Sequence, residues 1–148
     1  MNLNNPTPAM RQYLDIKSRN KDAIVFFRMG DFYEMFFDDA VLASRLLGIT
    51  LTSRDREKAI PMCGIPYHSV SQYLARLVRE GHKVAICEQM ENPGLAKGIV
   101  ERAVTRLVTP GIALDDELLD PHSNNFIASV SWNGDRAGLS FMDVLSGE

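Results

Sequence analysis

Short β-rich runs alternate with helix-type segments over the first 111 residues, and this alternation decides which folds the chain can adopt. The run AIVFFRM (23–29) is rich in β-branched and aromatic residues and lies between turn formers, which predicts a strand. After Gly30 and Asp31, the run FYEMFF predicts either a second strand or a continuation of the first one beyond a bend. Further strands are predicted at 49–53, 83–90 and 102–111.

The first helix is predicted before these strands. Thr7 followed by Pro8 is typical of a helix start, because a hydroxyl can cap the helix and proline suits its first position. Apolar residues at helical spacing, among them Met10 and Leu14, continue the pattern to about residue 20.

Two more helices are predicted between the strands. The segment DDAVLASRLLG places acids in a first helical turn and ends at Gly48. The other helix is predicted to begin at Ser69 with a capping box and to end at Gly81. Strands that alternate with helices indicate a mixed α/β (α+β) domain over residues 1–111, with a mixed β-sheet flanked by helices.

The chain changes character after this domain. Residues 112–123 are acidic and broken by Pro121, which predicts a linker. Two β-rich runs follow, and Asn133-Gly134 between them predicts a hairpin with a type I′ turn. A lone hairpin is marginally stable in water. We therefore expect residues 124–148 to be the first hairpin of a truncated second domain.

Composition excludes several classes of protein. The chain of 148 residues is 45% hydrophobic and 24% charged, which is typical of a globular protein and not of a disordered one. It has no apolar run near the ~20 residues that a membrane span requires, and its N-terminus lacks the features of a secretory signal. Cys63 and Cys87 do not have a zinc-type spacing. These features predict a cytoplasmic location with two buried thiols.

Charge is unevenly spread along the chain. Residues 1–111 hold 15 Lys and Arg against 12 Asp and Glu, a balance of +3, whereas residues 112–148 hold one Arg against seven acids, a balance of −6. The two parts sum to the net charge of −3. The first part can approach DNA weakly, while the acidic part is expected to face elsewhere.

Signals for catalysis are poor, and no catalytic or metal-ligating residue is assigned. The chain lacks the G-x-x-x-x-G-K-[S/T] loop, the G-x-S-x-G elbow and the H-E-x-x-H motif. Its three histidines are scattered, which favours structural or exposed roles. Asp38 and Asp39 suit the positive end of a helix macrodipole. A metal-dependent nuclease that uses Asp31, Asp38 or Asp39 remains the alternative from the enzyme class.

The stretch MGDFYEMFF raises a different possibility. In a strand, residues two apart share a face, so Phe32 and Glu34 project together. An ionised glutamate is almost never fully buried without a partner, so this face is not plain core. One interpretation is a binding site that needs a ring and an acid. The other is an exposed aromatic edge strand, as in a module that docks onto proteins.

Five blocks of sequence favour the first interpretation. In order, they are TPAMRQYLDIK, VFFRMGDFYEMFFDDA, IPMCGIPYHSV, VAICEQM and RLVTPGI. Together they resemble the N-terminal mismatch-recognition domain of the bacterial MutS family of DNA mismatch-repair sensors, over most of residues 7–112. The hairpin after residue 123 resembles the start of that family's connector domain, which is ribonuclease-H-like.

The resemblance implies roles for particular residues. The family's Phe-x-Glu pair falls on Phe32, which would wedge into the minor groove at a mispair, and on Glu34, which would hydrogen-bond the mispaired base. Six residues are candidates for supporting contacts to DNA: Met29, Arg54, Met62, His68, Lys97 and Arg106. The segment DREKA (55–59) is shorter here than in many members, which bears on how far this loop reaches toward DNA.

The resemblance also implies partners and cofactors. The full-length protein would be a homodimeric, DNA-dependent ATPase that uses ATP and Mg²⁺, binds mismatched double-stranded DNA and recruits a MutL-type partner in the bacterial cytoplasm, on the nucleoid. This fragment would have no cofactor and no enzymatic activity, in agreement with the missing phosphate loop. Because residues 1–111 carry a charge of only +3, we expect the isolated domain to bind DNA only at low salt.

Overall fold

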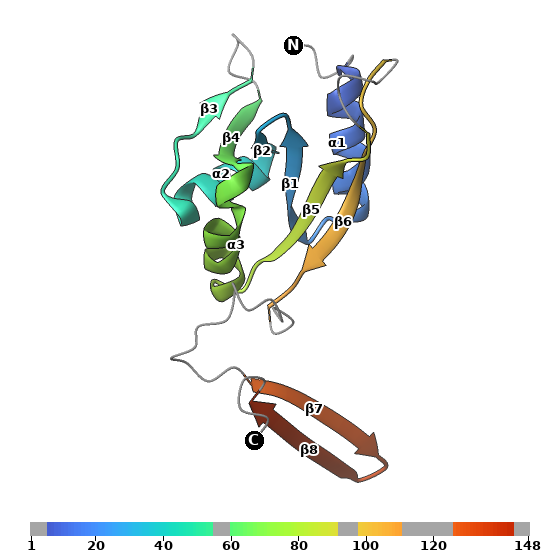
Figure 1. Ribbon diagram of the computed structural model, residues 1–148. Helices are drawn as coiled ribbons and strands as arrows, with labels where there is room; N and C mark the ends of the chain where they lie inside the picture. The colour runs from blue at the N-terminus through green and yellow to red at the C-terminus, as the bar shows by residue number, and fades with distance from the viewer. Residues whose placement is uncertain (1–5, 55–59, 92–97, 111–125, 144–148) are drawn as a thin grey trace. The chain divides into compact units, whose positions relative to one another are not determined.

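A computed structural model describes residues 6–54, 60–91, 98–110 and 126–143, and it divides the chain into two units, Met1–Pro110 and Gly111–Glu148. The elements of the first unit are α1 (Pro8–Arg19), β1 (Ala23–Met29), β2 (Phe32–Phe36), α2 (Phe37–Leu47), β3 (Thr52–Ser53), β4 (Pro61–Pro66), the 3-10 turn η1 (Tyr67–Ser69), α3 (Val70–Arg79), β5 (Lys83–Gln89) and β6 (Arg102–Val108). The strands form one six-stranded sheet in the order β3-β4-β2-β1-β5-β6 (Figure 1). The predicted mixed α/β fold is confirmed.

The run after Gly30-Asp31 is a second strand and not a continuation of the first. β2 pairs antiparallel with β1, and Met29 lies directly opposite Phe32. Only Gly30 and Asp31 form the loop, and Gly30 has φ +59°. A glycine with positive φ at the first central position is what a two-residue type II′ hairpin turn requires.

The rest of the sheet is mixed. β1 runs parallel to β5, while β2, β4 and β3 pair antiparallel in succession, as do β5 and β6. Strand β4 was not predicted from the sequence, because it starts and ends with proline and has Gly64 in its interior. It forms because it lies between β2 and β3, whose backbone groups it pairs with.

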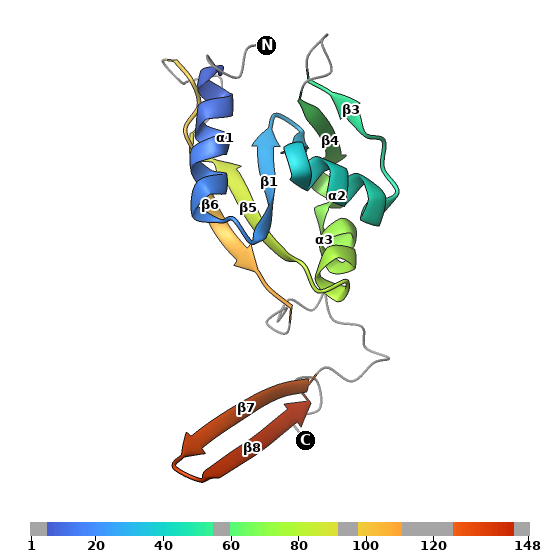
Figure 2. The same cartoon turned by 180° about the vertical axis from the view of Figure 1, so that it is seen from behind.

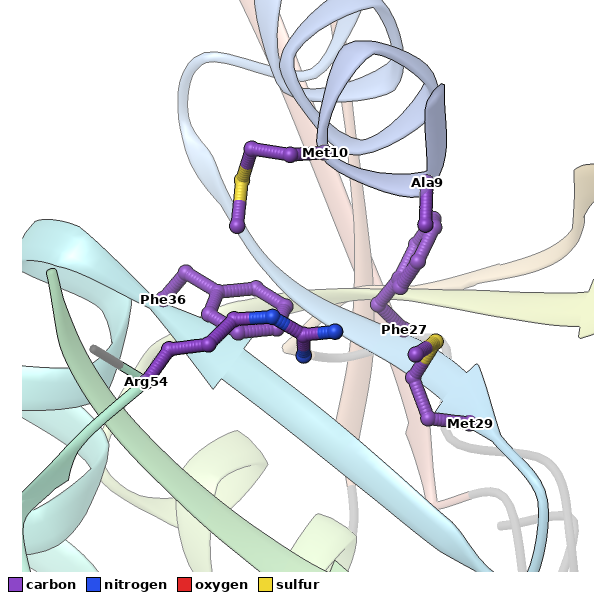
Figure 3. A pocket seen from close by; sticks show the side chains of 6 residues that line it. All are labelled: Ala9, Met10, Phe27, Met29, Phe36 and Arg54. Atoms are coloured by element: carbon purple, nitrogen blue, oxygen red, sulfur yellow. The ribbon is translucent and has the colours of Figure 1, made fainter. Parts of the chain in front are cut away.

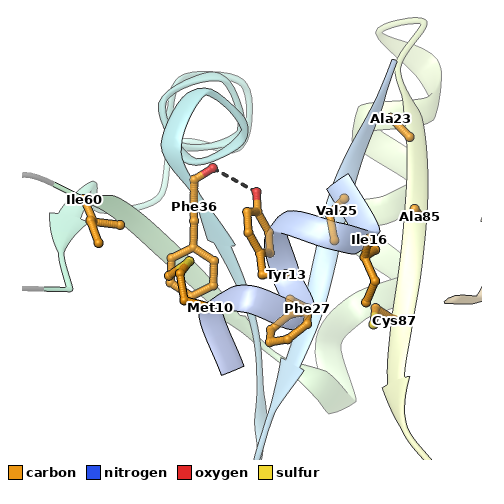
Figure 4. Close-up of a cluster of buried hydrophobic side chains, with 10 residues drawn as sticks. All are labelled: Met10, Tyr13, Ile16, Ala23, Val25, Phe27, Phe36, Ile60, Ala85 and Cys87. Carbon is orange, nitrogen blue, oxygen red and sulfur yellow. Dashed lines mark hydrogen bonds between the residues drawn. The ribbon is translucent and has the colours of Figure 1, made fainter. Parts of the chain in front are cut away.

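Helix α1 covers the face of the sheet that carries the main apolar cluster. It packs against β1 and β6, lying behind β5 and β6 in Figure 1 and in front of them in Figure 2. Met10, Tyr13 and Ile16 are its buried residues, three positions apart, whereas Leu14, predicted as part of the apolar pattern, is exposed. Figure 4 shows this cluster, in which Tyr13 Oη donates a hydrogen bond to the carbonyl of Phe36 at 3.1 Å.

Helices α2 and α3 pack against each other, α2 also against β4 and α3 also against β5. Leu74 and Leu77 of α3 are buried, and so are Ile24 and Phe26, which alternate along β1 with residues of the main cluster. β1 is therefore covered on both faces. The predicted capping box of α3 does not form, because η1 leads into the helix and Ser69 (φ −107°, ψ 11°) is not extended as a capping residue usually is.

Asp39 is a buried carboxylate with a structural role. It accepts hydrogen bonds from Tyr13 Oη at 3.2 Å and from the Val25 N–H at 3.0 Å, and it forms an ion pair with Lys17 Nζ at 2.8 Å. β1 pairs with β2 only from Phe27 onward, so Asp39 supplies the acceptor that a strand would otherwise offer to Val25. Burial and the nearby carboxylate raise the pKa of Tyr13.

The second unit is a two-stranded antiparallel hairpin of β7 (Phe126–Asn133) and β8 (Arg136–Asp143). Asn133 pairs with Arg136, so the loop is Gly134-Asp135, one residue later than the predicted Asn133-Gly134 turn. Gly134 has φ +60°, and it takes the first central position because Asn133 is still paired. The predicted linker, 112–123, lies outside the described residues.

No helix in the described part of the chain combines the length and the apolar composition needed to cross a bilayer.

Replacing Asp39 by alanine is expected to destabilise the chain by about 2–4 kcal/mol, because Tyr13, Lys17 and Val25 would each lose a partner in a buried place. Urea unfolding of the 148-residue chain measures this difference. Asp38→Ala, one position away and exposed, is the control and should cost less than about 1 kcal/mol. Equal effects of the two substitutions would contradict this role for Asp39.

Cys63 and Cys87 are free and buried, and burial raises the pKa of each thiol to about 12. The thiolate fraction at pH 8 is then on the order of 1 in 10⁴. We expect both thiols of the native chain to stay unreacted with a chromogenic disulfide reagent while the urea-unfolded chain titrates two. Fast reaction of either thiol under native conditions would contradict the burial of that cysteine.

Candidate nucleic-acid interface

Phe32 and Glu34 lie on one face of the sheet, next to the β1–β2 turn. Phe32 stands opposite Met29 on one side and Pro66 on the other, and Glu34 stands opposite Phe27 and Gly64. The Phe32 side chain is 49% exposed, although both neighbouring strands are paired with its own. An aromatic ring with half of its surface in water contributes little to the core, so it is available for a ligand.

Gly64 keeps this surface open. A Cβ atom built at position 64 would lie 4.0 Å from Phe32 Cδ1 and 3.8 Å from Glu34 Cγ. Any larger side chain there would stand beside both residues and cover them. The missing side chain at the paired position of β4 therefore leaves the ring and the acid accessible together.

The turn before Phe32 is held in place by hydrogen bonds to its own backbone carbonyls. Arg28 Nε donates to the carbonyl of Gly30, and the Tyr67 N–H donates to the carbonyl of Asp31 at 2.9 Å. The Arg28 guanidinium lies 3.9 Å from the centroid of the Tyr67 ring, a cation–π contact. Both carbonyls of the two-residue loop thus have partners, which restricts the direction in which β2 begins.

Glu88 completes this bracing. Its carboxylate forms an ion pair with Arg28 at 3.5 Å and accepts a hydrogen bond from Tyr33 Oη. Burial and the hydrogen bond to Glu88 raise the pKa of Tyr33 to about 12, so the phenol stays a donor at any physiological pH. Tyr33 is buried on the face opposite to Phe32 and Glu34, and it anchors the strand that presents them.

Glu34 is paired with Arg54. The distance from Arg54 Nη1 to Glu34 Oε2 is 2.7 Å, and the two side chains are 26% and 21% exposed respectively. The Arg54 guanidinium also lies 5.3 Å from the centroid of the Phe36 ring. This arginine is the partner that allows an ionised glutamate to lie in an aromatic cluster.

A shallow pocket lies beside this pair. It is lined by Ala9, Met10, Phe27, Met29, Phe36 and Arg54 (Figure 3). Five of these side chains are apolar, and Arg54 supplies the one cation. Met29, predicted as a supporting contact, is half-buried here and stands directly opposite Phe32.

Arg102 is a further cation on this face that the sequence did not single out. Its guanidinium lies 5.1 Å from the centroid of the Phe27 ring, and its Nε donates to the carbonyl of Arg28 at 2.7 Å. Burial lowers the pKa of Arg102, and the charge of Arg54 adds to this effect. Arg54, which follows β3, thus lines the pocket, while Arg102 of β6 contacts Phe27, one of its lining residues.

Arg106, the predicted contact on β6, lies on the other face. A register shift between Ile86 and Cys87 puts Arg106 opposite Ile86 and Val104 opposite Cys87. Directly paired residues share a face, so the shift separates Arg106 from the face of Val104 and Phe27. A bulge of this kind leaves no local mark in the sequence.

The other predicted contacts are spread around the unit. Met62 pairs with Phe36 and packs half-buried against the main cluster. His68 is exposed in η1, with its ring edge-on to Tyr67 at 5.9 Å between centroids. Lys97 and the loop 55–59 lie outside the described residues.

The described residues offer no support for metal chemistry. Among them, no group of three or more histidines, cysteines or acids could hold a metal ion. Asp39, one of the three acids considered for a nuclease, is committed to Tyr13, Lys17 and Val25. The nuclease alternative is therefore not favoured. A half-exposed ring can instead stack on a flat apolar partner, and the paired acid beside it can accept a hydrogen bond.

Comparison with known proteins identifies the family. A family model described as MutS domain I matches residues 7–117. The chain is 54% identical over 143 residues to the DNA mismatch repair protein MutS of Myxococcus xanthus, covering 96% of this chain and 16% of that protein. It is 58% identical over 144 residues to the protein of the same name from Syntrophomonas wolfei, covering 96% and 17%. For Caldicellulosiruptor bescii the identity is 56% over 145 residues, covering 96% and 16%.

The chain thus spans about a sixth of the length of the curated relatives that it matches. The family predicted from the five sequence blocks is confirmed. Because the family model covers 111 of its 148 residues and these relatives share more than half of their aligned residues with it, the chain belongs to the MutS family.

Proposed function

We propose that this chain recognises mispaired DNA in mismatch repair by inserting the Phe32 ring into the minor groove at the mispair, where Glu34 hydrogen-bonds the mispaired base. The observation that carries the proposal is the half-exposed ring of Phe32 on a braced hairpin, with an acid beside it and no side chain at Gly64 to cover either. The names of the relatives, DNA mismatch repair protein MutS, agree with it.

The wedge acts through the deformability of the duplex. An apolar ring pushed between base pairs unstacks them partly and kinks the helix, at a cost of a few kcal/mol per step. A mispaired base is already poorly held, so the same deformation costs less there. Stacking on the ring returns roughly 1–3 kcal/mol whatever the base, which suits a sensor that must accept many different mispairs.

A rigid support matters for such a wedge. If the turn yielded, part of the energy of insertion would go into bending the protein instead of the DNA. The bonds from Arg28 to Gly30 and from Tyr67 to Asp31 hold the loop that precedes Phe32. The ring therefore enters DNA from a fixed position, which lowers the entropy lost on binding.

Glu34 supplies discrimination. A carboxylate near phosphates is repelled, so this residue weakens binding to matched duplex. At a mispair, a base whose Watson–Crick partner is wrong offers a ring N–H to the carboxylate, or a purine N7 if the glutamate is protonated. The hydrogen bond then offsets part of the repulsion.

The proposal also covers the division of this chain into domains and the activity of the full-length protein. We assign residues 1–111 to mismatch recognition, 112–123 to a linker and 124–148 to the first hairpin of a connector domain. Beyond this chain, the protein acts as a homodimeric, DNA-dependent ATPase in the bacterial cytoplasm, on the nucleoid, and recruits a MutL-type partner. The chain has no phosphate-binding loop, so ATP and Mg²⁺ would bind outside it.

Phe32→Ala in the full-length protein should reduce the preference for a G·T duplex over a matched duplex by roughly tenfold or more, because the stacking contact at the mispair is lost. Titration of labelled duplexes by fluorescence anisotropy measures both affinities. Val41→Ala on α2 is the matched control, since Val41 is apolar and 48% exposed and does not lie on β2. An unchanged preference in Phe32→Ala would instead favour the protein-docking alternative.

Glu34→Ala should raise the affinity for matched duplex by roughly 3- to 10-fold, because a negative charge near the phosphates is removed. The preference for the G·T duplex should narrow at the same time, since the hydrogen bond to the base is lost. The same titrations at one fixed salt concentration measure both changes. A lower affinity for matched duplex would contradict the proposed role of the acid.

A further inference from the structure

We infer that Arg54 is a positioning residue for Glu34 and that it sets mismatch specificity through this carboxylate, instead of serving only as a cation for phosphates. The inference rests on the proposed function and deepens it. It starts from the ion pair between Arg54 Nη1 and Glu34 Oε2 at 2.7 Å.

The pair is fixed at the arginine end. The Arg54 N–H donates to the carbonyl of Ile60 at 3.0 Å, which ties its backbone to the residue before β4. Its guanidinium lies 5.3 Å from the centroid of the Phe36 ring. A planar cation held by an aromatic ring and an anchored backbone loses little further freedom when it binds a carboxylate.

The strand between Arg54 and Glu34 does not cover the acid. Arg54 follows β3, and β4 separates β3 from β2. The β4 residue opposite Glu34 is Gly64, which presents no side chain against the acid. The same glycine that leaves Phe32 uncovered therefore also leaves Glu34 uncovered.

One carboxylate oxygen remains available for a base. Within the described part of the chain, the bond from Arg54 goes to Oε2, and Oε1 accepts no hydrogen bond. Glu34 can thus accept a hydrogen bond from a mispaired base at Oε1 while Arg54 holds Oε2. The pair also carries no net charge, so the acid repels phosphates less than it would alone.

Loss of Arg54 should therefore have two effects. The released carboxylate repels any duplex more strongly, and it is no longer oriented for the mispaired base. The first effect lowers affinity for matched and mismatched DNA alike, whereas the second lowers only the affinity for mismatched DNA. Without Glu34, Arg54 is simply a cation, and its loss should affect both duplexes equally.

A double-mutant cycle in the full-length protein tests this. The four proteins are the unsubstituted one, Arg54→Gln, Glu34→Ala and the double variant, each titrated with matched and G·T duplexes at one low salt concentration. We expect Arg54→Gln to lower the G·T-to-matched affinity ratio by roughly 3- to 10-fold when Glu34 is present. In the Glu34→Ala background, the same substitution should change the ratio by less than about twofold.

Two further variants control for charge and for folding. Lys83→Gln removes one positive charge and breaks the exposed Lys83–Asp22 pair (2.6 Å), where β1 and β5 begin, at the other end of the sheet from Phe32. It should leave the ratio unchanged. Arg54→Lys keeps the charge but not the planar guanidinium. It should therefore leave the affinity for matched duplex unchanged and lower the G·T-to-matched affinity ratio. If Arg54→Gln fails to unfold cooperatively, Arg54→Lys takes its place in the cycle.

The inference is overturned if Arg54→Gln, or Arg54→Lys in its place, lowers both affinities by the same factor whether or not Glu34 is present. That result would make Arg54 a phosphate contact and no more. It would leave the proposed function intact. Two different results would contradict the proposed function: a G·T preference that survives Phe32→Ala, or no G·T preference in the unsubstituted protein.

Discussion

Two residues, Gly30 and Asp31, close the β1–β2 hairpin, and the register that this loop sets decides which side chains share a face with Phe32. Met29 then stands opposite Phe32, and Phe27 opposite Glu34. A slip of one residue would move the ring and the acid to the other face, among buried side chains. The bracing by Arg28 and Tyr67 protects this register, because it occupies both loop carbonyls.

The net charge of the first unit and the charged contacts beside Phe32 have different consequences. The net charge of +3 over residues 1–111 is small, so in the proposed function selectivity depends on local contacts. Glu34 and the two arginines near it, Arg54 and Arg102, are partly withdrawn from water, where their interactions are screened less than those of exposed charges. In the proposed function, the arrangement of these three side chains therefore contributes to specificity for mispaired DNA.

Local sequence patterns predicted those elements whose own residues carry a clear helix or strand signal. Thr7-Pro8 started α1 as predicted, and the AIVFFRM run formed β1. β4 was missed because its prolines and Gly64 hide a strand that depends on its neighbours for pairing. Leu14 belongs to the apolar pattern but is exposed, because helix periodicity alone does not say which of two apolar stripes meets the sheet. The Gly134 turn was displaced because pairing extends to Asn133.

The candidate site was predictable only in part, for a similar reason. Phe32 and Glu34 are two positions apart on one strand, so their common face follows from the period of a strand. The pairing of Glu34 with Arg54, 20 residues away, depends on the order of β2, β4 and β3 in the sheet. The separation of Arg106 from Arg102 depends on a bulge. Neither feature can be read from the spacing of residues along the chain.

Whether the ring of Phe32 enters the base stack can be observed directly by ¹⁹F NMR, with 4-fluorophenylalanine in place of Phe32 in the full-length protein. Insertion at a mispair predicts a ring-current shift of the fluorine signal when a G·T duplex is added and no comparable shift with the matched duplex. A signal that is the same with both duplexes, or that moves with neither, would contradict insertion.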